Sequence, residues 1–191
     1  HHIYSAGADD YISKPFVEPE LVTRIFNRLE RNRLLRNLAE TDQLTGIANR
    51  RQSMKEFNRY LTLSQRYAQP LCLAVLDLDH FKQVNDQYGH DSGDRVLQRF
   101  AQVLRNVFCN EEIVGRWGGE EFLVGLYGFT KKQARARFEQ VFQIIRQENF
   151  ISSGNAIFQV TFSAGLAEAP LDGTDFHHLY RVADSALYKA K

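Results

Sequence analysis

The sequence predicts an α/β (α+β) domain built on a mixed β-sheet flanked by helices, with one long helix ahead of it. Three observations lead to this fold class. The six apolar residues 71–76 suit a strand that is buried on both faces. Gly118 and Gly119 separate two apolar runs and so predict a β-hairpin, whose strands are antiparallel. Segments of helical periodicity alternate with these strands, and strand–helix–strand connections favour parallel pairing.

Composition and charge narrow the class of protein. The chain has 191 residues, of which 43% are hydrophobic, enough for one ordinary globular domain and a short appendage. The formal net charge of +1 gives no electrostatic case for nucleic-acid binding. No apolar run reaches the roughly 20 residues that span a bilayer, and no signal peptide is visible, so we expect a cytoplasmic protein without membrane insertion. Cys72 and Cys109 lie in apolar settings without metal-type spacing, which favours core thiols in a reducing compartment.

The first 17 residues contain a short strand-like segment, Tyr11–Ser13, followed by a Lys14-Pro15 step at which a central strand cannot continue. This stretch resembles the closing part of a response-regulator receiver domain. In that family the lysine before the proline contacts the phosphorylated aspartate, often across a cis peptide bond. That aspartate lies far upstream in such domains and is absent from this sequence. We therefore expect residues 1–17 to be the C-terminal remnant of a receiver domain; a plain turn is the alternative.

Residues 18–40 predict one long helix. Pro19 suits the first turn, and leucine and isoleucine side chains recur at roughly helical spacing to form an apolar stripe. We expect this segment to be the last receiver helix running on as a linker. The stripe is suited either to packing on the chain's own domain or to pairing with a second copy as a short coiled coil. The arginines on the other faces are expected to be solvated.

The region from residue 41 onward alternates helices and strands. Residues 41–46 break the long helix, residues 49–67 resume helical periodicity, and Pro70 ends that segment. A further strand is expected at 159–166. Further helices are expected at 95–109, at about 130–149 and at 175–191.

Two aspartates end the buried strand. Asp77 and Asp79 are two residues apart, so an extended chain presents both on one side at the strand's carboxyl end. A helical turn at 81–86 and a loop rich in turn formers at 88–94 follow. Acids suit a cation while free backbone N–H groups at a helix start suit phosphate, which predicts a site for a metal-bound polyphosphate. An aspartate that caps the following helix would explain one acid but not two.

The predicted hairpin carries two adjacent carboxylates, Glu120 and Glu121. Strand alternation points them to opposite faces and so turns Glu121 away from the site of Glu120. Taken alone, this segment fits a polar hairpin tip as well as it fits a metal-binding or proton-transfer site. Asp77, which ends the buried strand earlier in the chain, favours the second interpretation.

Five motifs, taken in order, make residues 41–191 resemble the GGDEF family of diguanylate cyclases. They are Asp42-Gln-Leu-Thr-Gly-Ile-Ala-Asn-Arg-Arg51, Asp77–His90 with Gly93-Asp94, Gly118-Gly-Glu-Glu-Phe122, Val160–Gly165 and Ala183–Lys191. One such motif would be weak, whereas five in register are very specific. The resemblance implies the mixed five-stranded sheet that adenylyl cyclases share with polymerase palm domains. It also implies condensation of two GTP molecules into cyclic di-GMP, with release of two pyrophosphates.

Carried over by position, the resemblance assigns roles to individual residues. Asp77 and Glu120 would ligate Mg²⁺, or alternatively Mn²⁺, through their side chains, and Leu78 would do so through its carbonyl. Glu120 is also the candidate base for the ribose 3′-hydroxyl that attacks the α-phosphorus. Further candidates for the site are Asp79, Glu121 and Arg116.

The same resemblance implies how the nucleotide is bound. Asn85 and Asp94 would hydrogen-bond the guanine edge, and His90 matches another substrate-contact position. A carboxylate accepts from both N1–H and the exocyclic amine of guanine, which adenine cannot offer, so such a site should reject ATP. The phosphates would be held by backbone N–H groups around Phe81 and Lys82 and, at their terminal end, by Lys191.

The resemblance also implies partners. One domain would hold one GTP, so two copies must face each other to close the ring, and a two-fold homodimer is expected at least transiently. The receiver remnant implies a two-component response regulator, with an upstream histidine kinase that acts on the missing receiver part. In that architecture receiver phosphorylation promotes dimerisation. This sequence lacks the phosphorylatable aspartate and cannot be switched in that way itself.

Two departures from the family's pattern matter. The window Cys109–Glu112 stands where many members carry an Arg-x-x-Asp product-binding motif, so the arginine is missing and the aspartate is replaced. This predicts weak or absent feedback inhibition through that site. The sequence ends at Lys191, where the family usually continues into Gly-Arg-Asn, so the phosphate contact of that arginine is missing. The activity expected of the parent protein therefore does not carry over automatically to this stretch.

An active cyclase is the leading interpretation. The main alternative is a catalytically inactive GGDEF domain that acts as a GTP-binding sensor or an interaction module, against which the intact metal and guanine positions argue. A DNA-binding response regulator is disfavoured because no helix-turn-helix follows the linker. Another nucleotide cyclase, or one with a hybrid dinucleotide product, stays open because the choice of base depends on Asn85 and Asp94 alone.

Overall fold

The computed structural model describes residues 18–108 and 111–191, and the chain divides into two units, residues 1–39 and 40–191. The described part of the first unit belongs to helix α2 (Glu18–Glu40). Val22, Ile25, Phe26 and Leu29 are each more than half exposed on this helix. The predicted long helix is thus confirmed, while its role as a linker stays a prediction. The expected receiver remnant, residues 1–17, lies outside the described residues.

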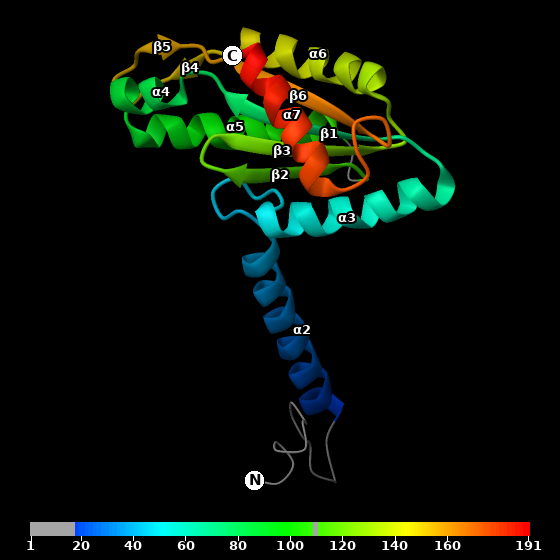
Figure 1. Ribbon diagram of the computed structural model, residues 1–191. Coiled ribbons are helices and arrows are strands. Elements are labelled where there is room, and N and C mark those ends of the chain that lie inside the picture. The colour runs from blue at the N-terminus through cyan, green and yellow to red at the C-terminus, as the bar shows by residue number, and fades with distance from the viewer. Residues whose placement is uncertain (1–17, 109–110) are drawn as a thin grey trace. The chain divides into compact units, whose positions relative to one another are not determined.

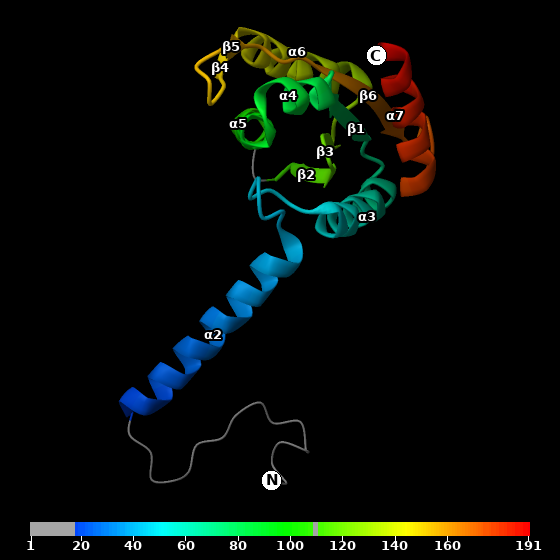
Figure 2. The same cartoon turned by 90° about the vertical axis from the view of Figure 1, so that its left-hand side faces the viewer.

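The second unit is a four-stranded sheet with helices on both faces (Figures 1 and 2). A separate two-stranded hairpin, which the sequence did not predict, stands beside it. In spatial order the sheet strands are β2 (Ile113–Gly118), β3 (Glu121–Tyr127), β1 (Leu71–Leu78) and β6 (Phe162–Ala169), and the hairpin pairs β4 (Phe150–Ile151) with β5 (Ile157–Phe158). The helices are α3 (Arg50–Tyr67), α4 (Phe81–Tyr88), α5 (His90–Val107), α6 (Lys131–Gln147) and α7 (Phe176–Ala190). No helix in the described ranges is both long and apolar enough to cross a membrane.

The class of fold is as predicted, but the expected mixed, five-stranded pairing is wrong for the described strands. The sheet has four strands, and β3 and β6 both pair with β1 in the antiparallel sense. The strand–helix–strand connections do join strands that run the same way, β1 with β2 and β3 with β6. In each case another strand lies between the two, so the parallel-running strands are not neighbours. In the described ranges, parallel pairing is limited to one isolated bridge, between Ala48 and Gly115.

Two apolar cores fill the faces of the sheet. Helices α4, α5 and α6 cover one face together with Leu76 and Leu78 of β1, and helices α3 and α7 cover the other with Leu73 and Val75 (Figure 2). All eight residues of β1 are buried, as its apolar run predicted. Because side chains alternate along a strand, Asp77 falls on the α3 and α7 face.

The connection between α4 and α5 differs from the sequence prediction. A loop was expected at 88–94, but α5 begins at His90, and the two helices meet at Gly89, whose φ is 83°. The Ser92 hydroxyl donates to the Tyr88 carbonyl at 2.8 Å, which satisfies an acceptor at the end of α4. The turn-forming residues that suggested a loop instead form a tight corner and the first turn of a helix.

Candidate active site

The carboxyl end of β1 brings together acids from three segments. The side chain of Asp77 is 12% exposed, and in the sheet Asp77 lies opposite Glu121 of β3. Residues directly opposite each other in an antiparallel pair share a face, so these two carboxylates lie on the same side of the sheet. Glu120 occupies the turn between β2 and β3, where its carbonyl accepts a long hydrogen bond, 3.4 Å, from the Leu78 N–H.

The expectation that alternation turns Glu121 away is wrong. Glu120 is in the turn and not in a strand, so strand alternation does not relate the two side chains. Burial, and after it the neighbouring carboxylate of Asp77, raise the pKa of Glu121. Asp184 of α7 adds to this effect, so a third element contributes charge to the cluster.

Lys191 is the close cationic neighbour of Asp77. Its Nζ lies 2.8 Å from Asp77 Oδ1, although this buried oxygen makes no hydrogen bond of good geometry with the described residues. The contact with Asp77, and then the charges of Asp79 and Glu120, raise the pKa of Lys191. The Lys191 side chain is 43% exposed. A partly exposed ammonium therefore stands where a metal cation beside Asp77 would stand.

These residues fit a magnesium ion. Within residues 18–108 and 111–191, no three His, Cys, Asp or Glu side chains converge as a preformed metal cage. Mg²⁺ is usually held by one or two carboxylates together with water and substrate phosphate, so such a cage is not required. The poorly satisfied oxygen of Asp77, with Glu120 and the Leu78 carbonyl beside it, supplies the hard oxygen donors that this ion prefers.

Asp79 has a structural role in this arrangement. Its two carboxylate oxygens accept from the Thr161 hydroxyl at 2.7 Å and the Ser163 hydroxyl at 2.8 Å, and its N–H donates to the Thr161 carbonyl at 2.9 Å. These bonds hold the end of β1 against β6. Both oxygens of Asp79 are therefore occupied by hydroxyl groups, whereas the close neighbour of Asp77 is the Lys191 ammonium.

A small cavity of about 250 Å³ opens beside Asp79. Its lining includes His80, Thr161 and Lys191, and helix α4 begins directly after His80. The first N–H groups of a helix have no intrahelical acceptor, so those of Phe81 and Lys82 are suited to phosphate oxygens. The cavity therefore lies beside a lysine and the residue that precedes α4, and phosphate binding by the N–H groups of Phe81 and Lys82 stays a prediction.

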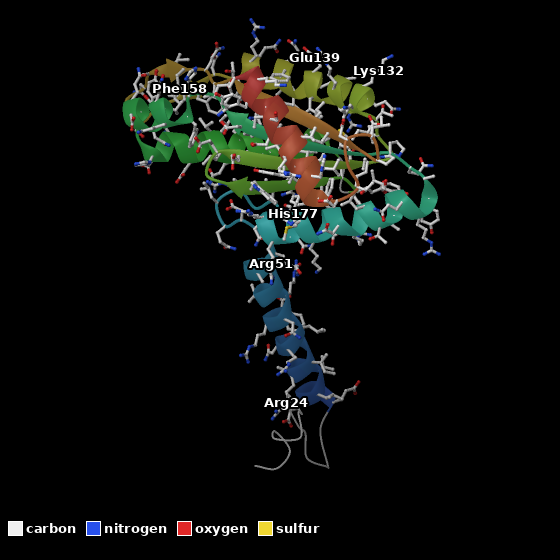
Figure 3. All side chains as sticks on the ribbon, in the orientation of Figure 1. Arg24, Arg51, Lys132, Glu139, Phe158 and His177 are labelled. Carbon is white, nitrogen blue, oxygen red and sulfur yellow. The ribbon has the colours of Figure 1, made fainter. Side chains whose placement is uncertain are left out.

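The residues expected to contact guanine lie at the α4–α5 corner. Asn85 is half-buried on α4, and His90 and Asp94 are exposed on the first turns of α5. The hairpin supports this corner, because Phe158 (Figure 3) stacks on Tyr88 with ring centroids 4.2 Å apart. The contact of these three residues with a base stays a prediction.

Arg116 joins the first sequence motif to the hairpin turn. Its Nη1 lies 3.1 and 3.3 Å from the two oxygens of Asp42, and its Nε donates to the Gly119 carbonyl at 2.9 Å. Burial raises the pKa of Asp42, but hydrogen bonds from Thr45 and Arg116 outweigh this and hold it below its usual range. Gly119 has φ 53°, a conformation that favours glycine. Arg116 thus fixes the turn that carries Glu120 and is a positioning residue in this structure.

Sequence reasoning did not single out Thr161, Ser163 or Asp184. Thr161 and Ser163 are two residues apart near the start of β6, a spacing that puts both on one side of an extended chain. Asp184 precedes Lys191, the residue that caps the end of α7, by seven residues, about two helical turns, so the two are placed on one side of the helix. Each spacing was visible in the sequence, but the distant carboxylates that these residues meet, Asp79 and Glu121, were not.

Comparison with known proteins identifies the family. The family model described as diguanylate cyclase, GGDEF domain, matches residues 39–191. A diguanylate cyclase of Vibrio cholerae is 36% identical over 169 residues, which cover 88% of this chain and 52% of that protein. The response regulator PleD of Caulobacter vibrioides is 32% identical over 196 residues, which cover 97% of this chain and 43% of PleD.

A solved structure agrees with the fold described above. The coiled coil and GGDEF domain of DgcB from Caulobacter crescentus, in complex with c-di-GMP, matches with a TM-score of 0.81 at 29% identity. The match covers 89% of this chain and 90% of that one. The chain spans about half the length, or less, of the curated relatives it matches, so it corresponds to one part of those proteins.

Proposed function

Because the chain belongs to the GGDEF diguanylate cyclase family, we propose that residues 41–191 condense two GTP molecules into cyclic di-GMP and two pyrophosphates. One observation carries this proposal: the poorly satisfied carboxylate of Asp77 lies beside the Glu120 turn and near the cavity at the start of α4. An acid of this kind has a clear use when a metal-bound triphosphate is present.

The chemistry divides among a few residues. Asp77, Glu120 and the Leu78 carbonyl would hold Mg²⁺, or Mn²⁺, which supplies neutralisation of the phosphate charge and eases ionisation of the ribose 3′-hydroxyl. Glu120 is the candidate acceptor of the hydroxyl proton. Lys191, which contacts Asp77 and lines the cavity, would hold the terminal phosphates.

Base selection would depend on the α4–α5 corner. Asn85 and Asp94 would bind the guanine edge, His90 would add a contact, and the N–H groups of Phe81 and Lys82 would hold phosphate. The site should reject ATP, because adenine leaves the Asp94 carboxylate without its donors. This requirement separates the proposal from another nucleotide cyclase or a hybrid product.

Two copies must meet for the ring to close. The exposed apolar side chains Val22, Ile25 and Phe26 of α2 suit a coiled coil with a second copy. The DgcB structure contains a coiled coil with its GGDEF domain, and PleD is a response regulator. We therefore place this chain in a homodimeric response regulator of the cytoplasm, governed by an upstream histidine kinase, with no role for nucleic acid.

The test is product formation by the full-length parent protein. The parent, incubated with GTP and Mg²⁺, is expected to form cyclic di-GMP that chromatography resolves, and Glu120→Gln is expected to abolish it. Glu139→Gln, an exposed carboxylate on α6 (Figure 3), is the matched control and should leave the rate unchanged. A parent that binds GTP without forming product supports the inactive sensor instead. Undiminished product from Glu120→Gln removes that residue from catalysis.

A further inference from the structure

Gly93 of α5 lies against the side chain of Asn85 on α4. A Cβ placed on Gly93 would come 2.0 Å from Asn85 Oδ1 and 3.0 Å from Asn85 Cγ. It would also approach the ring of Phe81 at 3.1 Å. Contacts below 3.0 Å essentially never occur for a real Cβ atom. The amide of Asn85 therefore occupies the volume that any side chain at position 93 would need.

The backbone does not explain the glycine. Gly93 lies within α5, and its φ is outside the left-handed range that favours glycine. Alanine is also a better helix former than glycine, so local helix formation alone would favour a replacement. What the missing side chain provides at position 93 is space for Asn85.

The surroundings decide which group would move if that space were filled. The corner between the helices is held by hydrogen bonds from the Gly89 N–H to the Asn85 carbonyl and from the Ser92 hydroxyl to the Tyr88 carbonyl. Phe81 belongs to the core beneath α4. The Asn85 amide sits at the end of two rotatable bonds and is half-buried, so it yields first.

We propose that Gly93 is a positioning residue for guanine recognition. Because Gly93 has no side chain, the Asn85 amide can lie directly against α5, one residue before Asp94. The two polar groups then face one base from two helices. This inference rests on the proposed function, in which Asn85 and Asp94 bind the guanine edge, and it adds the residue that holds one of them in place.

A double-mutant cycle in the full-length parent tests the proposal. Gly93→Ala is expected to raise the KM for GTP about tenfold, the size expected when one polar contact to the base is lost, and to change kcat by about twofold at most. Asn85→Ala should have a similar effect. Adding Gly93→Ala to Asn85→Ala should raise the KM no further, because the displaced side chain is already gone.

The matched control is Gly154→Ala, where a Cβ meets only the Ser152 hydroxyl oxygen at 3.9 Å. It should leave the KM for GTP at the parent value. Thermal unfolding of all four cycle proteins guards against a folding defect. If the clash with Asn85 is what matters, the double variant should be at least as stable as Asn85→Ala.

The outcomes are separable. An unchanged KM for Gly93→Ala, an equal rise in the KM with Asn85 already removed, or a double variant less stable than Asn85→Ala would each overturn the role given to Gly93. An unchanged KM for Asn85→Ala overturns the guanine assignment of Asn85, and this inference with it. Formation of cyclic di-GMP by the parent is measured in the same assay, so a failure here is distinct from a failure of the cyclase proposal.

Discussion

Replacing Asp42 by Asn tests the link between the first sequence motif and the hairpin turn. Asp42 Oδ1 accepts from the Thr45 N–H at 2.9 Å, the Thr45 hydroxyl at 2.7 Å and Arg116 Nη1 at 3.1 Å. Asparagine keeps the shape of the side chain and removes its charge. The Arg116 guanidinium then loses its anionic partner and meets, at one position, another N–H donor.

The size of the effect follows from burial. The Arg116 and Asp42 side chains are only 16% and 24% exposed, so water replaces the lost carboxylate incompletely. Hydrogen bonds to charged groups contribute about 1.5–3 kcal/mol, and breaking a fully buried pair costs about 3–5 kcal/mol. For this partly exposed pair we expect a loss of about 2 kcal/mol, which lowers the Tm of a domain of this size by roughly 4–8 °C.

Calorimetry at neutral pH measures the loss, and Glu56→Gln is the matched control. The Glu56–Arg59 pair is shorter, 2.8 Å against 3.1 Å, but its arginine side chain is 57% exposed, so its removal should cost no more than about 0.5 kcal/mol. Equal Tm values for the parent and Asp42→Asn would refute the role of the Arg116–Asp42 pair. A loss for Glu56→Gln as large as that for Asp42→Asn would refute the argument from burial.

The same variant has a defined pH dependence. Burial opposes ionisation of Asp42, but its bonds to Thr45 and Arg116 lower its pKa below the usual value of about 3.9. A carboxylate with a lowered folded-state pKa stabilises fully above its unfolded pKa, and this stability is lost as the pH falls through the folded-state value. The difference in Tm between parent and variant should therefore be constant from about pH 7 to pH 5 and shrink below about pH 4. A difference that persists unchanged in acid would contradict the electrostatic origin.

The acidic cluster, the core thiol and Arg137 give three further predictions. Burial, followed by the charge of Asp77, raises the pKa of Glu121, so Glu121→Gln should raise the Tm of the metal-free protein at pH 7. This gain should vanish below about pH 4, where Glu121 is protonated in the folded and the unfolded state. A lower Tm of the variant at pH 7 would contradict this. Burial raises the pKa of Cys72 to about 12, so iodoacetamide at pH 8 should leave this thiol unmodified until the chain unfolds. Labelling of Cys72 in the folded protein, detected by peptide mass spectrometry, would contradict this. Glu112 Oε2 lies 3.4 Å from Arg137 Nη2, so this carboxylate already has a partner within the domain. Titration of the parent with product should therefore show no tight non-competitive inhibition through this position. Tight inhibition that Glu112→Ala abolishes would contradict this prediction.

Local patterns in the sequence were sufficient for the main elements. The apolar run of β1 and the periodicity of α7 depend on burial along one element, which a sequence displays directly. The turn at Gly119 depends on a positive φ, which glycine adopts without steric cost. Asp77 could be predicted for the same reason, because a carboxylate at the end of a buried strand breaks the pattern around it.

Non-local features were not predictable in this way. Which strand lies beside β1 depends on packing between distant segments. β3 lies between β1 and β2, and β1 lies between β3 and β6, although the sequence suggested that each of these two pairs would be neighbours. The start of α5 depends on a bond from Ser92 to the carbonyl of Tyr88, and the turn-forming composition of that region concealed the helix. The hairpin of β4 and β5 has two residues in each strand, too few to display a period. The side taken by Glu121 depended on one residue of register, since Glu120 belongs to the turn.

The cluster around Asp77 contains carboxylates whose mutual repulsion a bound cation would reduce. Asp77 and Glu121 lie on one face with like charges that repel each other, which costs stability, and Lys191 offsets this for Asp77. Asp79 is held in a different way, because its two carboxylate oxygens accept hydrogen bonds from the Thr161 and Ser163 hydroxyls. With a divalent ion held by Asp77, Lys191 would be free to contact phosphate in the adjoining cavity, which it already lines. In the proposed function the same exchange would supply a cation to the triphosphate, so metal and nucleotide should bind more tightly together than either binds alone.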